Sequence, residues 1–367
     1  MRLISINALK AQMVCGRTIW NEAGLPLLQK NVVITDGIIS RLKQLGIQYL
    51  YIEDKISSGI AIEESVSLEV RTKAVKQITD SFKKVKGLTS QAASLVLDKQ
   101  SKVIGQIVDD LLTTIIKSDE VLTVLTDSLI YDEYLYQHSF QVTLYSIAIG
   151  KELGYSSDEL RTIGIGAMLH DVGKLVIPSD ILFKEDRLTD EEYEIMKQHA
   201  RYGFEILRNL HTVSLLVAHC AFQHHERIDG SGYPRGLVDA DIHPYAKIIA
   251  VADVFDAVTS KRVYREKMLP SQGIEIIEAG SGIIFDKRVV EAFKRSIVHY
   301  PNGTIVLLSD GRRGVVAKQN LSNPKLPFIR IFEENNTILN TTYLFNLIEH
   351  PEVTIEKVET DYVGHVE

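Results

Sequence analysis

The chain has 367 residues, more than the usual length of about 100–200 residues for one domain, and this predicts more than one folding unit. Hydrophobic residues make up 45% of it and charged residues 24%, which excludes a mostly disordered or low-complexity protein. The formal net charge of −7 excludes a global positive field for nucleic acid or an anionic membrane surface, so an anionic ligand must be bound by local charges.

Residues 1–60 are predicted to form a small α+β module. Thr35 can cap a short helix whose apolar residues share one face. Residues 17–28 favour a hairpin, in which Pro26 restricts the second strand to the edge of a sheet. The polar, glycine-containing segment 57–67 indicates a linker, so the module ends there.

Two further accessory regions are predicted around a central domain. Residues 61–128 show apolar residues at spacings of three and four on both sides of Gly87, which indicates two helices of a connector that packs on the next domain. Residues 300–367 contain short alternating runs and predict a β-rich module.

The central region, residues 129–299, is predicted to be helical. The capping-box patterns Ser156-x-x-Glu159 and Thr189-x-x-Glu192 mark the starts of two helices. Pro244 is a good first-turn residue for a third. These signals place the neighbouring histidines on helices.

Histidines and carboxylates occupy inward positions of the apolar stripes in this region. A lone histidine in such a stripe is commonly a hydrogen-bonded core residue. Burying all of these groups together costs several kcal/mol for each unpaired charge, whereas divalent metal ions satisfy them all at once. The groups are His138, His170, Asp171, His199, His224, His225 and Asp253.

We expect two divalent ions, because seven candidate ligands exceed what one ion usually takes. Asp171 follows His170 directly and is the natural bridging carboxylate. Imidazole nitrogen and carboxylate oxygen, with no thiolate except that of Cys220 at hand, favour a transition metal over calcium. Iron or manganese is preferred, and cobalt, nickel and zinc remain alternatives.

Three motifs follow one another here: the stretch His-Asp-Val-Gly-Lys at 170–174, His-His-Glu at 224–226, and Asp-Gly-Ser-Gly-Tyr-Pro at 229–234. Together they resemble the HD-GYP subgroup of HD-domain phosphohydrolases, over about residues 138–265. The resemblance implies a mainly α protein with an all-helical catalytic domain between the two small modules. It also implies an enzyme, a phosphodiesterase that hydrolyses cyclic di-GMP to linear pGpG, with GMP as a further product left open. A hydroxide bridging the ions would attack phosphorus.

The resemblance implies roles for individual residues. The seven groups above would be the metal ligands, with Asp171 also in the catalytic set. Lys174 would contact the scissile phosphate, and Arg262 and Arg265 would bind substrate phosphate and guanine. The loop Gly232-Tyr233-Pro234 would shape the site and contact signalling proteins. Tyr233 either stacks on a guanine or packs the loop.

Two positions depart from the family pattern. Tyr134 stands where members with a third ion carry a glutamate, so we expect two ions. Val263 replaces a proline common between the two basic residues. The role of Glu226 stays open between an ion pair that holds the loop and a part in catalysis.

Other readings remain open. The same metal hydrolase can act on another nucleotide, such as cyclic GMP-AMP or one like guanosine tetraphosphate, or the chain can be a weakly active, messenger-binding signalling scaffold.

The N-terminus lacks the features of a signal peptide, and no apolar run reaches about 18 residues, so we expect a cytoplasmic protein without a membrane span or nucleic-acid partner. A homodimer through the connector helices is a further alternative.

Overall fold

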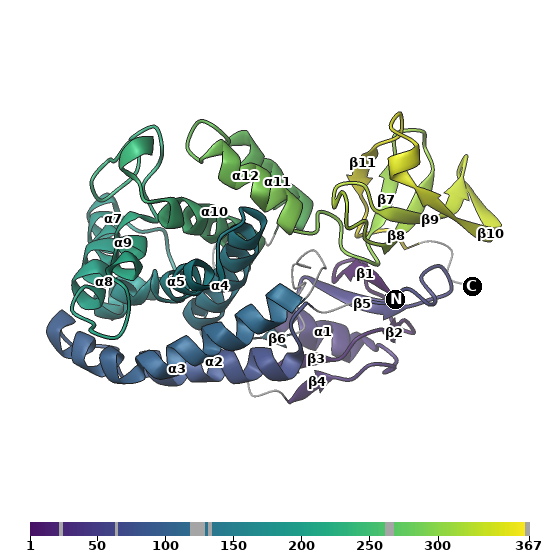
Figure 1. Ribbon diagram of the computed structural model, residues 1–367. Helices are drawn as coiled ribbons and strands as arrows, with labels where there is room; N and C mark the ends of the chain where they lie inside the picture. Colours follow the sequence, from purple (N-terminus) through teal and green to yellow (C-terminus); the bar gives the residue numbers. More distant parts are fainter. Residues whose placement is uncertain (22–24, 63–64, 118–128, 131–133, 261–267, 364–367) are drawn as a thin grey trace. The chain divides into compact units, whose positions relative to one another are not determined.

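The computed structural model describes residues 1–367 except 22–24, 63–64, 118–128, 131–133, 261–267 and 364–367. The chain divides into two compact units (Figure 1). The β-rich unit contains Met1–Glu64, Thr123–Asp132 and Val298–Glu367, and the helical unit contains Ser65–Leu122 and Glu133–Ile297. The connector helices therefore share a unit with the central helical region, and the two flanking modules share the other.

The N-terminal part of the β-rich unit is the predicted α+β module. Its strands form two small sheets of order β1-β5-β2 and β4-β3-β6. Thr35 caps the helix by accepting a hydrogen bond from the Ile38 N–H group, and Pro26 lies in edge strand β4, so both predictions are confirmed. The elements are β1 (Arg2–Ser5), β2 (Val14–Cys15), β3 (Ile19–Asn21), β4 (Pro26–Leu28), α1 (Asp36–Gln44), β5 (Tyr49–Glu53) and β6 (Leu129–Ile130).

The C-terminal part of this unit is one antiparallel sheet of order β10-β9-β8-β7-β11. Strands β7, β8 and β9 fall on short alternating runs at 304–308, 314–317 and 328–332, which predict strands there. The sequence did not indicate β10, which is exposed along most of its length, or the short β11. The elements are β7 (Ile305–Leu308), β8 (Arg313–Lys318), β9 (Phe328–Glu334), β10 (Thr337–Asn346), the 3-10 turn η3 (Leu347–Glu349) and β11 (Ile355–Val358).

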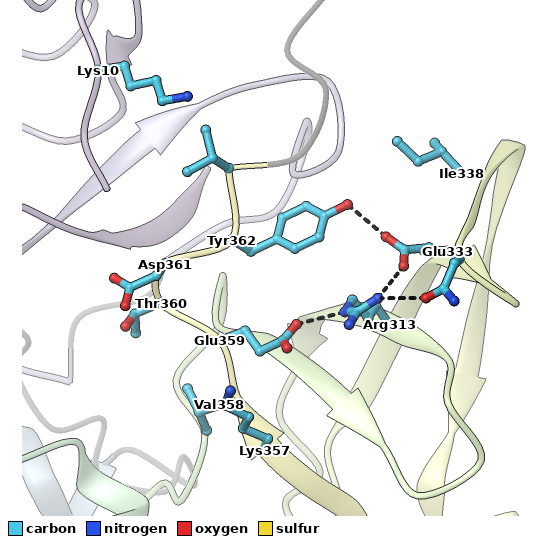
Figure 2. A pocket seen from close by; sticks show the side chains of 12 residues that line it. Lys10, Arg313, Glu333, Ile338, Lys357, Val358, Glu359, Thr360, Asp361 and Tyr362 are labelled. Atoms are coloured by element: carbon cyan, nitrogen blue, oxygen red, sulfur yellow. Dashed lines mark hydrogen bonds and ion pairs between the residues drawn. The ribbon is translucent and has the colours of Figure 1, made fainter. Parts of the chain in front are cut away.

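A polar network fastens the C-terminal tail to this sheet, beside a cavity of about 700 Å³ (Figure 2). The Arg313 guanidinium donates to Glu333 and, over 2.8 Å, to Glu359. The Tyr362 hydroxyl donates to the second oxygen of Glu333 at 2.8 Å. Because Glu333 is almost fully buried, these bonds replace the water that its carboxylate loses on folding.

The helical unit is built from packed helices, with α4, α5, α8, α9 and α10 around its core (Figure 1). Both capping boxes form as predicted, and Gly87 lies between the two connector helices. The elements are α2 (Leu68–Lys83), α3 (Ser90–Lys117), α4 (Tyr134–Glu152), α5 (Ser157–Leu169), η1 (Val172–Val176), α6 (Ser179–Leu182), α7 (Asp190–Lys197), α8 (His199–Leu207), α9 (Leu215–Gln223), η2 (Asp239–Asp241), α10 (Pro244–Thr259), α11 (Pro270–Ala279) and α12 (Lys287–Ser296).

These elements confirm the predicted fold class, which is mainly α with a small α+β module and a β-rich module at the two ends. Within the described ranges, every helix is too short or too polar to cross a bilayer.

Glycine lets three helices of the core approach closely. A Cβ atom at Gly164 on α5 would lie 2.7 Å from Val108 Cγ1 on α3 and 3.1 Å from Ile147 Cδ1 on α4. Real Cβ atoms do not approach other atoms to 2.7 Å, so the spacing of α3, α4 and α5 depends on a residue without a side chain.

We therefore expect Gly164→Ala to destabilise the protein by about 1–3 kcal/mol, because the branched Val108 cannot move away without a backbone shift. The midpoint of urea unfolding, followed by far-UV circular dichroism, measures the change. Gly37→Ala on α1 is the control. A Cβ there meets only Thr35 Oγ1 at 3.9 Å, so this variant should be neutral or slightly more stable. Equal midpoints for the two variants would contradict the packing argument.

Candidate metal centre

Five helices bring the predicted ligands to one place. His138 lies within α4, and Asp253 lies within α10. The other groups stand at helix ends: His170 and His224 follow the last residues of α5 and α9, and His199 begins α8. Helix ends let side chains from different directions converge.

The Asp171 carboxylate lies between two groups of imidazoles. Its Oδ2 atom is 3.5 Å from His138 Nε2 and 3.4 Å from His170 Nε2. Its Oδ1 atom is 3.4 Å from His199 Nε2 and 3.8 Å from His224 Nε2. One oxygen therefore faces each group, an arrangement in which one carboxylate can ligate two ions.

Asp253 makes the second connection between the groups. Its Oδ1 atom lies 3.2 Å from His138 Nε2, and its Oδ2 atom lies 3.8 Å from His225 Nδ1. The donor atoms of two sets are close enough to hold an ion each: His138, His170 and Asp171 in one set, and Asp171, His199, His224 and His225 in the other. The structure thus brings all seven predicted groups together.

Backbone carbonyls orient three of the imidazoles in the same way. The Nδ1 atoms of His170, His199 and His224 contact the carbonyl oxygens of the residues three positions earlier, at 2.6, 2.7 and 2.9 Å. A carbonyl oxygen only accepts, so each Nδ1 carries the proton and donates. Each Nε2 atom then keeps its lone pair and points into the cluster, which is the form a metal ligand needs.

His138 is held differently, by a carboxylate. Its Nδ1 atom lies 2.6 Å from Asp256 Oδ2, and the other Asp256 oxygen accepts from Ser260 Oγ at 2.8 Å. Asp256 was not predicted from the sequence. The available signal was its position three residues after Asp253 on α10, which places both carboxylates on one helix face.

The surroundings set the charges of the imidazoles. Burial lowers the pKa of His199 to about 4 and lowers the pKa values of His224 and His225 well below the usual range, so these rings are neutral at pH 7. Burial also opposes protonation of His138, but hydrogen bonds to Asp253 and Asp256 outweigh it and raise the pKa of His138 to about 9.

Both central carboxylates stay ionised. Burial by itself raises the pKa of Asp171, but the charge of Lys174, 2.5 Å away, and the imidazole of His170 hold it well below the usual value. Burial is outweighed in the same way at Asp253, mainly by the hydrogen bond to His138. In contrast, burial raises the pKa of the Cys220 thiol to about 12, and Cys220 is not among the described groups whose donor atoms converge.

The donors fit a divalent metal centre. His170 Nε2 and Asp171 Oδ1 are buried and make no hydrogen bond within the described part of the chain. Such atoms lose their hydration on folding, at a cost of about 1–3 kcal/mol each if nothing replaces it. A metal ion bound by imidazole nitrogen and carboxylate oxygen supplies that replacement.

A glycine fixes the position of His199 relative to the His170–Asp171 turn. A Cβ atom at Gly173 in η1 would lie 2.0 Å from the His199 carbonyl oxygen and 2.5 Å from the Gly203 nitrogen. Only glycine permits this approach of η1 to α8. The glycine of the His-Asp-Val-Gly-Lys motif therefore serves packing.

Glu226 holds the loop that follows His225. Its buried carboxylate accepts hydrogen bonds from the backbone N–H groups of Arg235 at 2.8 Å and Leu237 at 2.9 Å. Both oxygens are thus used in holding the loop, which favours the structural role over catalysis. The Tyr233 ring stacks on the His225 ring, with centroids 4.6 Å apart and an interplanar angle of 28°.

Arg262 and Arg265 lie outside the described residues. The spacing of Ile195 and His199 by four residues predicts one helix with both side chains on its inward face, and this is wrong. The helix is broken at Gln198 into α7 and α8, and Ile195 is 40% exposed.

Residues 124–289 match the protein family described as HD domain. The chain is 35% identical over 228 residues to the cyclic di-GMP phosphodiesterase PA4108 of Pseudomonas aeruginosa, covering 62% of this chain and 55% of that protein. It is 43% identical over 175 residues to a cyclic di-GMP phosphodiesterase of Thermotoga maritima, covering 47% of each. It is 39% identical over 155 residues to the 3'3'-cGAMP-specific phosphodiesterase 2 of Vibrio cholerae, covering 42% of this chain and 30% of that protein. The chain thus spans about half the length of the first two relatives.

We expect Asp256→Asn to lower metal affinity by about 10- to 100-fold, because the amide keeps an acceptor for His138 but removes the negative charge. Equilibrium titration of the metal-free protein with Mn²⁺ measures the affinity. Ser260→Ala is the matched control, since it removes only the hydrogen bond to the far oxygen of Asp256. If both variants bind Mn²⁺ like the unmodified protein, Asp256 does not support the site.

Metal binding should release protons at pH 7, because His138 is protonated in the metal-free protein and must become neutral to ligate. Affinity should therefore rise by up to roughly tenfold per pH unit from pH 7 and level off above the His138 pKa of about 9. Calorimetric Mn²⁺ titrations in buffers of different ionisation enthalpy count the protons. Affinity that is constant across this pH window contradicts the charge assignment.

Proposed function

Because residues 124–289 match the HD domain family, we propose that this chain is a metal-dependent phosphodiesterase that hydrolyses cyclic di-GMP to linear pGpG, with further cleavage to GMP left open. The family match and the relatives named cyclic di-GMP phosphodiesterases confirm the resemblance to HD-GYP proteins. One observation carries the proposal: the two oxygens of Asp171 face separate imidazole groups.

We propose two ions as the occupants of the site, with Asp171 as the shared ligand and Asp253 as a further carboxylate. Nitrogen and oxygen donors without a thiolate favour iron or manganese, with cobalt, nickel and zinc as alternatives. When bound, a pair of ions supplies a nucleophile at neutral pH and neutralises charge on the phosphate.

The chain's own residues orient the ligands and the substrate. The Asp256 carboxylate fixes the ring of His138, and three backbone carbonyls fix the other imidazoles described above. The Lys174 side chain is 22% exposed although its ammonium group contacts buried Asp171, so it reaches both the centre and an incoming phosphate. There it offsets negative charge that develops on the phosphoryl oxygens.

The GYP loop has a supporting role in this proposal. Glu226 and the close packing at Gly232, where a Cβ would lie 2.4 Å from the Arg227 nitrogen, hold the loop in place. The loop in turn holds Tyr233 against His225. We retain substrate binding by Tyr233, Arg262 and Arg265 and the docking of signalling proteins on this loop as proposals.

Cyclic GMP-AMP is a second candidate substrate. The observation that favours it is the likeness to the V. cholerae phosphodiesterase named for this nucleotide. Competition between the two cyclic dinucleotides at fixed enzyme concentration distinguishes the readings, since the preferred substrate has the higher kcat/KM.

We expect Asp171→Ala to lose both metal ions and to lower cyclic di-GMP hydrolysis by more than about a hundredfold. Loss of a residue that only hydrogen-bonds to a metal ligand lowers activity by up to about a hundredfold, and loss of the shared ligand itself should cost more. Metal quantitation by mass spectrometry, together with product analysis by chromatography, measures both effects. Removal of metal with a chelator should abolish hydrolysis, and re-addition of Mn²⁺ or Fe²⁺ should restore it.

Asp158→Ala is the matched control, because Asp158 is an exposed carboxylate in the first turn of α5. It should keep full metal content and activity. A metal-loaded protein that leaves cyclic di-GMP intact, with Asp171→Ala no different, would overturn the proposed function.

A further inference from the structure

The metal centre opens to solvent at one edge. The side chains of His138, His170, Asp171, His199 and His224 are at most 1% exposed, whereas His225 is 17% exposed. Lys174, which contacts Asp171, is 22% exposed, so a substrate too large to enter the core approaches where Lys174 and His225 reach solvent. The side chains around this histidine decide what can bind there.

One tyrosine and one lysine line this edge. The Tyr233 ring covers a face of His225. The Lys197 ammonium lies 5.8 Å from the centre of the Tyr233 ring and 5.3 Å from the centre of the Tyr193 ring. Lys197 is the last residue of α7 and lies two residues before His199, so the end of this helix is next in the chain to a predicted metal ligand.

Two side chains of α7, those of Tyr193 and Lys197, are partly exposed to solvent. Tyr193 is 47% exposed, which is high for an aromatic ring. Lys197 is 23% exposed and forms an ion pair with Glu194, which is itself 66% exposed. A surface ion pair contributes at most about 1 kcal/mol, so Lys197 remains available to a stronger anion.

A cyclic dinucleotide needs such groups. It carries two phosphodiesters and two bases, and the metal centre with Lys174 accounts for one phosphate. Arg262 and Arg265, proposed above as further contacts, lie outside the described residues, whereas Lys197 is a described cation close to the centre. The chain has a net charge of −7, so the second phosphate needs a local cation. A nucleobase that lies outside the metal centre binds more tightly when it can stack on an aromatic ring.

We propose that Tyr193 and Lys197, here called the α7 pair, bind the half of the substrate that is not cleaved. The Tyr193 ring stacks on the base, and the Lys197 ammonium binds the uncleaved phosphate. This inference rests on the proposed function, because it assumes a cyclic dinucleotide at the metal centre. The α7 pair would then determine substrate specificity, because a small phosphodiester can be hydrolysed at the metal centre without contacting Tyr193 or Lys197.

A purely structural role for the pair predicts something different. If Lys197 only holds Tyr233 and His225 in place, its loss reduces metal content and the hydrolysis of every phosphodiester. If Lys197 binds the second phosphate, its loss weakens the binding of cyclic dinucleotides but not of simple phosphodiesters. It also makes the binding of cyclic dinucleotides less dependent on salt.

The test uses the full chain with Lys197→Met, Tyr193→Ala and Tyr193→Phe. Lys102→Met, an exposed lysine on α3, is the matched control. Turnover is measured with cyclic di-GMP and with bis(p-nitrophenyl) phosphate. Binding is measured by calorimetry with a phosphorothioate analogue of cyclic di-GMP at two salt concentrations, and metal content is measured for every variant.

We expect Lys197→Met and Tyr193→Ala each to raise the dissociation constant of the analogue by about tenfold, as for loss of a charged hydrogen bond or of one stacked base. The ratio of kcat/KM for cyclic di-GMP to that for bis(p-nitrophenyl) phosphate should fall to a similar extent. Lys197→Met should also flatten the salt dependence of binding. Tyr193→Phe keeps the ring and should behave like the unmodified protein.

Dissociation constants within twofold of the unmodified protein overturn the inference, as does a parallel loss of metal and of both activities. An unmodified protein that binds the analogue but does not hydrolyse cyclic di-GMP overturns the proposed function alone, and the dissociation constants of the variants then decide the inference. Absence of both binding and hydrolysis overturns both.

Discussion

The position of one buried carboxylate organises the helical unit. Asp171 directs its two oxygens at separate groups of imidazoles, and it does so from the turn between α5 and η1, where the chain leaves a helix. An unpaired charge at this depth costs several kcal/mol, so the surrounding groups must compensate it. The ammonium group of Lys174 compensates the Asp171 charge on the side that faces solvent. On the buried side, the imidazoles and a divalent metal centre compensate it.

Much of the surrounding structure holds the histidine and aspartate side chains of the metal centre in position. Gly173 lets η1 approach α8, and Gly164 lets α5 approach α3 and α4, so side chains on different helices meet without intervening bulk. Carbonyls three residues earlier fix the tautomers of three histidines, whereas a carboxylate, Asp256, holds His138. The one histidine at the solvent edge, His225, is instead held by the stacked ring of Tyr233.

The sequence predicted what local signals encode. Capping residues such as Thr35 and Ser156 gave correct helix starts. Helical periodicity places residues on one face and so indicated five of the candidate ligands, whereas Asp171 and His225 were included as the chain neighbours of two of them. Contacts between helices have no local signal, so the hydrogen bond from His138 to Asp256 and the break at Gln198 were missed. Strand β10 was missed because its exposed residues do not alternate.

The most direct test of the account is the anomalous scattering of crystals of the protein loaded with Mn²⁺. It should show two peaks about 3.5–4 Å apart, each within bonding distance of one Asp171 oxygen. A single peak, or two ions that share no Asp171 carboxylate, would contradict the central claim.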